Sequence, residues 1–127
     1  MDYQQRDSSP SPTHYLPDVF AIGSCTIRCL HSVRTLLIDD IHELRLTPTE
    51  YQLILLLLPG LAVDESYLAR VIFNDDILWA REAIEKHLTN IRGKLKKFPI
   101  RLSILRVTSY GYVLAAHRSD TRSQLRH

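Results

Sequence analysis

The sequence lacks the features that mark membrane, secreted and metal-binding proteins. Its longest apolar run, Leu53 to Leu58, ends at Pro59-Gly60 and is far shorter than the roughly 20 residues that span a bilayer. The N-terminus has no apolar core of a secretion signal, so we expect a cytoplasmic protein with no membrane partner. The 127 residues include only two cysteines, and the six histidines show no ligand-like spacing. We therefore expect neither a metal site nor a cofactor.

Enzyme motifs are missing as well. The chain has no Gly-rich phosphate loop, no nucleophile-base-orienter set and no paired carboxylates at catalytic spacing. The sequence thus predicts neither an enzyme nor a small-molecule substrate. Cys25 and Cys29 would lie on one face of a strand, and we interpret them as buried thiols.

Charge is distributed unevenly, although the formal net charge is only +2. Residues 80–127 hold eleven Lys and Arg against three acidic residues, whereas residues 1–79 hold five against eleven. Such segregation is typical of proteins that bind a phosphate backbone. The cations expected within the folded part are Lys86, Arg92, Lys94, Lys96, Lys97, Arg101 and Arg106.

The N-terminal half predicts an arm followed by a sheet. Residues 1–17 are rich in Ser and Pro with little to bury, so we expect a flexible arm. Four short β-branched and aliphatic runs follow, separated by polar breaks about two residues long, which indicates an antiparallel meander. The expected strands are residues 20–22, 25–30, 33–38 and 41–46.

Three helices and a hairpin are expected next. Thr47-Pro48-Thr49-Glu50 is typical of a helix start with a capping box, and this helix should run to Leu58. A second, short helix should start at residues 64–66, and residues 74–79 should form a loop. The third helix should cover residues 80–97, because apolar residues at 84, 88, 91 and 95 form one stripe.

Beyond this helix, residues 100–107 and 112–115 predict a β-hairpin across residues 108–111. The fold class is therefore α+β: one domain over residues 18–116, followed by a flexible basic tail over residues 117–127.

The polar face of the third helix suits a DNA groove. The alternative from the helical wheel alone is a solvated surface with scattered charge.

Three pieces of the chain, in this order behind a four-stranded sheet, carry a resemblance. They are Leu46 to Tyr51, His87 to Leu95, and Val107 with Gly111-Tyr112-Val113-Leu114. Over about residues 20–115 the chain resembles the winged-helix effector domain of OmpR/PhoB-type bacterial response regulators. The resemblance implies a winged helix-turn-helix, with the third helix in the major groove and the hairpin wing, residues 104–115, at the backbone and the minor groove.

The resemblance also implies roles for individual residues. The base-facing residues would be Glu85, Lys86, Thr89 and Asn90. The backbone and wing contacts would be Arg92, Gly93, Lys94, Lys96, Lys97, Arg106, Thr108, Tyr110 and Tyr112. Alternatives stay open: stabilisation of the helix dipole for Glu85, an exposed amide for Asn90, and burial for Tyr112. We expect His87 to pack within the fold.

Two departures from the family pattern stand out. Thr108 occupies the place of an arginine that often follows the wing valine, which leaves Arg106, two residues earlier, on the same side of the strand. No receiver domain precedes the effector region in this sequence, so we expect either a free-standing regulator or a fragment of a longer protein.

The partners expected from the resemblance are double-stranded DNA, RNA polymerase at an acidic loop containing Asp75, Asp76 and Trp79, and a second copy on direct-repeat DNA. Trp79 could equally fold over the core. The function expected is sequence-specific DNA binding by a transcription regulator, located at the bacterial nucleoid when bound. The alternative is a winged-helix module that binds other proteins.

Overall fold

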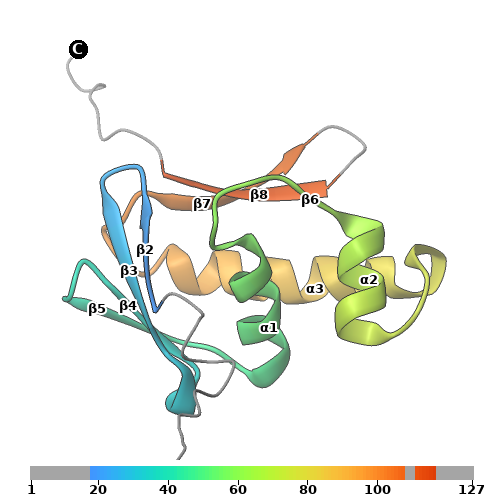
Figure 1. Ribbon diagram of the computed structural model, residues 1–127, viewed down its shortest axis with the longest axis horizontal. Helices are drawn as coiled ribbons and strands as arrows, with labels where there is room; N and C mark the ends of the chain where they lie inside the picture. The colour runs from blue at the N-terminus through green and yellow to red at the C-terminus, as the bar shows by residue number, and fades with distance from the viewer. Residues whose placement is uncertain (1–17, 108–110, 117–127) are drawn as a thin grey trace, which may run out of the picture.

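The computed structural model describes residues 18–107 and 111–116 (Figure 1). The expected arm, the expected tail, and two expected DNA-contact residues, Thr108 and Tyr110, lie outside the described residues. The described chain forms two antiparallel sheets and three helices.

The N-terminal sheet has the predicted meander order. Its strands are β2 (Val19–Ile22), β3 (Cys25–Leu30), β4 (Thr35–Ile38) and β5 (His42–Arg45), paired in sequence order. Residues 39–41 connect β4 to β5; Asp39 and Asp40 have positive φ values of 55° and 57°, and the chain turns tightly enough for the Ile41 N–H to donate to the Ile38 carbonyl at 3.1 Å. The expected third strand was too long at its start, because residues His31–Val33 form a 3-10 helix that ends at left-handed Arg34.

Helices α1 (Pro48–Leu57) and α2 (Glu65–Phe73) begin where the sequence predicts. The Thr47 hydroxyl accepts a hydrogen bond from the Glu50 backbone N–H, and the Glu50 carboxylate accepts one from the Thr47 N–H. These two bonds confirm the capping box. Asp64 caps α2 by accepting from the Ser66 N–H at 2.8 Å.

Helix α3 (Ile77–Leu95) is longer at its N-terminus than predicted. The prediction that residues 77–79 belong to a loop is wrong, since the helix begins directly after Asp76. Three consecutive apolar residues do not follow helical periodicity, and the structure resolves this by half-burying Ile77 while Leu78 and Trp79 point to solvent. The predicted buried stripe is confirmed at Ile84, Leu88, Ile91 and Leu95, and Ala80 is buried as well.

The C-terminal hairpin, β7 (Leu102–Val107) and β8 (Gly111–Ala116), is joined by a strand that the sequence did not predict. This strand is β6 (Val63–Asp64), which pairs with β8 so that the second sheet has the order β6-β8-β7. Gly111 allows this pairing, because a Cβ at that position would overlap the Val63 carbonyl. The strand therefore leads straight into α2 and fastens its start to the hairpin.

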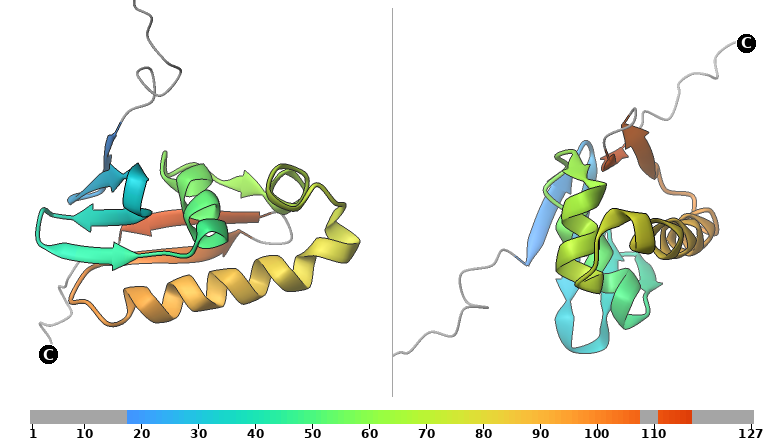
Figure 2. Two further views of the ribbon diagram at one scale, coloured as in Figure 1. Left: turned by 90° about the horizontal axis from the view of Figure 1, so that it is seen from below. Right: turned by 90° about the vertical axis from the view of Figure 1, so that its right-hand side faces the viewer.

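Helix α3 runs along the length of the molecule (Figure 1). Its N-terminal end lies at α2, and its C-terminal end lies near the N-terminal sheet, with the β6-β8-β7 sheet along it (Figure 2). The core between these layers includes the inward faces of both sheets and the stripe of α3. None of the described helices is long and apolar enough to cross a membrane.

Candidate nucleic-acid interface

The side of α3 that faces away from the core carries the four residues expected to face bases. Glu85, Lys86, Thr89 and Asn90 are all exposed, because they alternate with the buried stripe at helical spacing. Within the described chain, the side chains of Lys86, Thr89 and Asn90 make no hydrogen bond or ion pair. They are thus available to an external partner.

Two further lysines extend this surface at the C-terminal end of α3. Lys96 and Lys97 are exposed, and neither ammonium group has a partner among the described residues. A Cβ added at the exposed Gly93 would meet no atom within 4 Å beyond its chain neighbours and its own helix backbone. We call Lys86, Thr89, Asn90, Gly93, Lys96 and Lys97 the outer face of α3.

Lys94 belongs to the fold rather than to this outer face. Its ammonium group donates to the Glu50 carboxylate at 2.5 Å and to the Arg45 carbonyl at 3.1 Å. The Glu50 side chain is only 3% exposed. Burial alone would raise the pKa of Glu50, but the hydrogen bonds from Lys94 and Thr47 outweigh it and lower that pKa. The structure thus assigns the Lys94 charge to an internal pair.

Arg92 also makes an internal contact. Its Nε donates to the Ile104 carbonyl at 3.0 Å, which fastens β7 to α3. β7 is an outer strand of its sheet, and this bond joins its backbone to α3. Arg92 is half-buried, so it fixes the wing beside the helix.

Tyr112 is not at the surface. It is only 2% exposed, and its hydroxyl accepts a hydrogen bond from Arg106. Burial raises the pKa of Tyr112, although the Arg106 charge opposes this. The expectation of a phosphate contact by its hydroxyl is corrected accordingly: the alternating pattern of β8 turns this side chain into the core.

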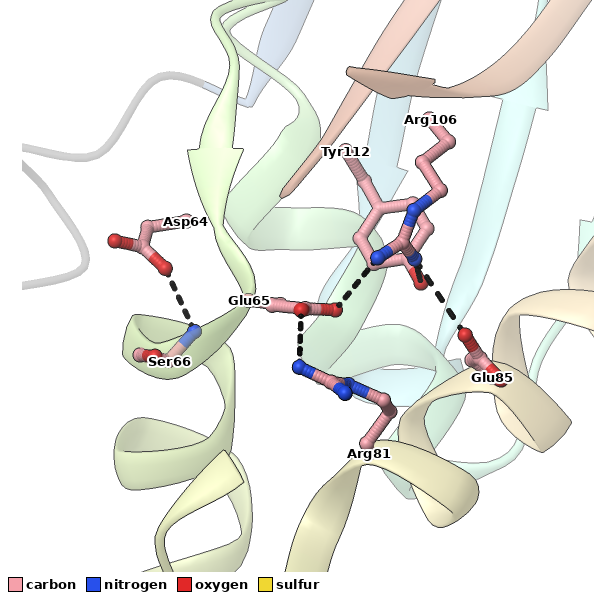
Figure 3. A network of polar contacts seen from close by, with 7 residues as sticks. All are labelled: Asp64, Glu65, Ser66, Arg81, Glu85, Arg106 and Tyr112. Carbon is pink, nitrogen blue, oxygen red and sulfur yellow. Dashed lines mark hydrogen bonds and ion pairs between the residues drawn. The ribbon is translucent and has the colours of Figure 1, made fainter. Parts of the chain in front are cut away.

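Arg106 joins Tyr112 to two carboxylates (Figure 3). Its guanidinium contacts Glu65 at 3.5 Å and Glu85 at 3.4 Å. Glu65 also binds Arg81 at 2.9 Å. We call Glu65, Arg81, Glu85, Arg106 and Tyr112 the arginine cluster. It connects α2, α3 and both strands of the wing.

Sequence reasoning missed Glu65 and Arg81. Glu65 is 5% exposed at the first position of α2, where an acidic residue already has a local explanation in the helix dipole. Its partners are 16 and 41 residues away, so no spacing within one element indicates them. Only the strand β6, which sets the start of α2 against the wing, brings these charges together.

His87 is half-buried and packs within the fold, and the two cysteines are buried, as expected. The His87 ring stacks on Phe73 at 6.0 Å between centroids, and its buried Nδ1 has no hydrogen-bond partner among the described residues. Cys25 and Cys29 are free and buried. Burial raises the pKa of Cys29 to about 11, so this thiol stays protonated at neutral pH and is a poor nucleophile.

The turn between α2 and α3 forms a second exposed region. Asp75 and Asp76 are exposed, and Trp79, on the first turn of α3, is 75% exposed. The alternative in which Trp79 covers the core is therefore wrong. Exposed apolar side chains also occur on α2 at Tyr67 and Val71.

Solved structures of other proteins share this fold. No family model matches the sequence, and no curated protein matches it. Among solved structures, the chain is similar to the DNA-binding domain of response regulator AdeR in complex with an intercistronic region. Here the identity is 23%, the TM-score is 0.58, and the match covers 70% of this chain and 92% of that one.

It is also similar to the Klebsiella pneumoniae RstA DNA-binding domain in complex with the RstA box. The identity is 20%, the TM-score is 0.60, and the match covers 80% of this chain and 100% of that one. The chain thus has the winged helix-turn-helix fold found in DNA-binding domains of response regulators.

Proposed function

We propose that this protein binds double-stranded DNA in a sequence-specific manner and regulates transcription. The observation that carries the proposal is the outer face of α3, where hydrogen-bonding side chains and lysines lie together without a polar partner among the described residues. The fold supports it, because the two response-regulator domains described above were solved in complex with DNA.

In this proposal α3 enters the major groove. Lys86 donates to guanine, Asn90 makes a paired contact with adenine, and Thr89 contacts a thymine methyl group or a phosphate. Lys96 and Lys97 neutralise phosphates, which fixes the register without selecting a sequence. The wing approaches the backbone beside the helix, where Arg92 holds β7.

The test is a binding selection on genomic DNA fragments at two salt concentrations, followed by sequencing. A recurring motif preferred over bulk DNA is the expected result. Affinity should fall as salt rises, with a log–log slope of about −0.9 for each phosphate contact. Sequence-blind binding would contradict the regulatory proposal, and no binding at low salt would favour the protein-binding module.

Single substitutions distinguish the residues that contact bases from the residues that contact phosphates. Lys86→Ala and Asn90→Ala should each lower the preference for the selected motif over random DNA by roughly 1–3 kcal/mol, because each removes a base contact. Lys96→Ala, the control, should weaken binding to both DNAs alike. Titrations on both DNAs measure this, and equal losses for all three variants would remove Lys86 and Asn90 as readers.

The exposed region formed by Asp75, Asp76 and the first turn of α3 favours a protein partner as a second role. Trp79 and Leu78 are 75% and 80% exposed beside the acidic residues Asp75 and Asp76, and exposed aromatic residues of this kind often anchor interfaces. We propose RNA polymerase as the partner. Trp79→Ala should leave DNA binding intact and reduce transcription from a target promoter in a purified system. Unchanged transcription would remove this role.

A further inference from the structure

The Arg106 guanidinium is held from two sides. Its Nη1 donates to the Tyr112 hydroxyl at 2.5 Å, and its carbon lies 5.2 Å from the centroid of the Tyr112 ring. Its Nη2 contacts Glu65, whose side chain is 7% exposed. Two buried groups therefore hold this guanidinium in place. As a result, it has little freedom to move toward a phosphate of bound DNA.

Glu65 is itself fixed by a second arginine. Its Oε1 accepts from Arg81 Nη2 at 2.9 Å, while its Oε2 faces Arg106 (Figure 3). Both oxygens of this buried carboxylate thus have a cationic partner, as a buried charge requires. Glu65 orients Arg106 toward α3, where Glu85 lies.

Glu85 is the outward end of the arginine cluster. Its Oε2 lies 3.4 Å from Arg106 Nη1 and its side chain is 52% exposed. No described residue makes a hydrogen bond or an ion pair with its Oε1. Glu85 directly precedes Lys86 on the exposed side of α3, so a free acceptor oxygen is presented next to the outer face.

An acidic side chain on a DNA-binding surface is unfavourable unless it makes a compensating contact, because the phosphates repel it. Arg106 offsets the Glu85 charge and restricts its rotamers, both of which lower the cost of holding a carboxylate near DNA. In the major groove, a carboxylate oxygen accepts from the N4 amino group of cytosine, and no other base pair presents the same donor pattern at that place.

We propose that Glu85 selects cytosine at one position of the DNA site and that Arg106 is the positioning residue that holds its carboxylate. This inference rests on the proposed function. It gives Arg106 a role different from the phosphate contact that its place on the wing suggests. The two roles differ in what they change: a positioning residue alters base preference, whereas a phosphate contact alters the salt dependence.

The experiment compares Glu85→Gln, Arg106→Gln, the double variant and the control Lys96→Gln. Each is selected on randomised duplex DNA, titrated on the preferred site and its single-base variants, and titrated at several salt concentrations. Circular dichroism melting confirms that each variant folds. Glu85 is exposed, so Glu85→Gln keeps the test usable even if Arg106→Gln unfolds the domain.

The expected wild-type result is a cytosine preference at one position. Glu85→Gln should reduce it about tenfold and shift it toward adenine, because an amide pairs with adenine N6 and N7. Arg106→Gln should reduce the preference at the same position and leave the salt slope unchanged. The double variant should lose no more than Glu85→Gln does, since Arg106 acts through Glu85. Lys96→Gln should lower the salt slope by about 0.9 with base preferences unchanged.

Two results would overturn the inference alone: a selected motif that Glu85→Gln leaves unchanged at every position, or an Arg106→Gln variant that behaves like Lys96→Gln. A wild-type selection that returns no preferred sequence would remove the proposed function and this inference with it.

Discussion

Lys94 lies on the basic third helix, yet its ammonium group is bound to the carboxylate of Glu50. Removing the lysine would leave a carboxylate that is 3% exposed with only the hydrogen bond from the Thr47 backbone N–H. We predict that Lys94→Ala lowers the free energy of unfolding by about 2 kcal/mol, at the low end for a broken buried pair because Lys94 itself is partly solvated. Urea unfolding measures this. Lys96→Ala, the control, should change stability by less than about 0.5 kcal/mol.

The pH dependence of that pair has a definite sign. In the wild type the pKa of Glu50 lies below its usual value of 4.5, so its contribution to stability is present above pH 4.5 and is lost as the pH falls through the lowered pKa. Without Lys94, burial raises the pKa of Glu50, and protonation on acidification relieves the cost of the buried charge. We predict that the stability difference between wild type and Lys94→Ala narrows between pH 7 and about pH 4. A constant difference in urea titrations over this range would contradict the prediction.

Sequence reasoning at this scale identified exposed residues better than paired ones. Lys86, Thr89 and Asn90 follow from helical periodicity, which fixes the side of α3 on which a residue lies. Lys94 and Arg106 have the same residue types as DNA-contact cations, and only partners from other elements distinguish them. Glu50 lies 44 residues from Lys94, so no local sequence pattern predicts that the two residues form a pair.

At the scale of elements, substitutions at two glycines test how tightly the strands and helices pack. A Cβ at Gly111 would overlap the Val63 carbonyl, whereas a Cβ at Gly93 would meet nothing within 4 Å. We predict that Gly111→Ala destabilises the domain by about 2–3 kcal/mol, because β6 must move off β8. Gly93→Ala should stabilise it by about 1 kcal/mol through helix propensity, which raises Tm by about 4–8 °C. Thermal unfolding distinguishes the two, and shifts of the same sign would contradict this account.

Local chemistry determined the clearest elements. The helix start at Thr47 was predictable because its capping box lies within four consecutive residues. Strand β6 was not, since two residues have no recognisable period. The first turn of α3 was not predicted because Leu78 and Trp79 are apolar yet exposed. Apolar residues on the exposed side break the 3.6-residue pattern by which a helix is recognised in a sequence.

At the scale of the whole molecule, two groups of cations with opposite roles occur in the described part of the chain after residue 80. Arg81, Lys94 and Arg106 are paired with buried carboxylates, whereas Lys86, Lys96 and Lys97 have no partner in the described part of the chain. We predict that the double variant Lys96→Gln/Lys97→Gln reduces the salt slope of DNA binding by about 1.8, about 0.9 for each lost phosphate contact. Affinity titrations between low and moderate salt measure the slope, and an unchanged slope would place the phosphate contacts elsewhere.

The sequence by itself determined the order of the elements, the amphipathic face of α3, the buried thiols and the excess of positive charge in the C-terminal part. These features depend on neighbours within one strand or helix, where spacing alone sets the side on which a residue lies. The tertiary structure decided which charges remain free. Glu50 and Glu65 become buried only when α1, α2, α3 and the wing pack together, and a buried carboxylate requires a cation from whichever element lies beside it.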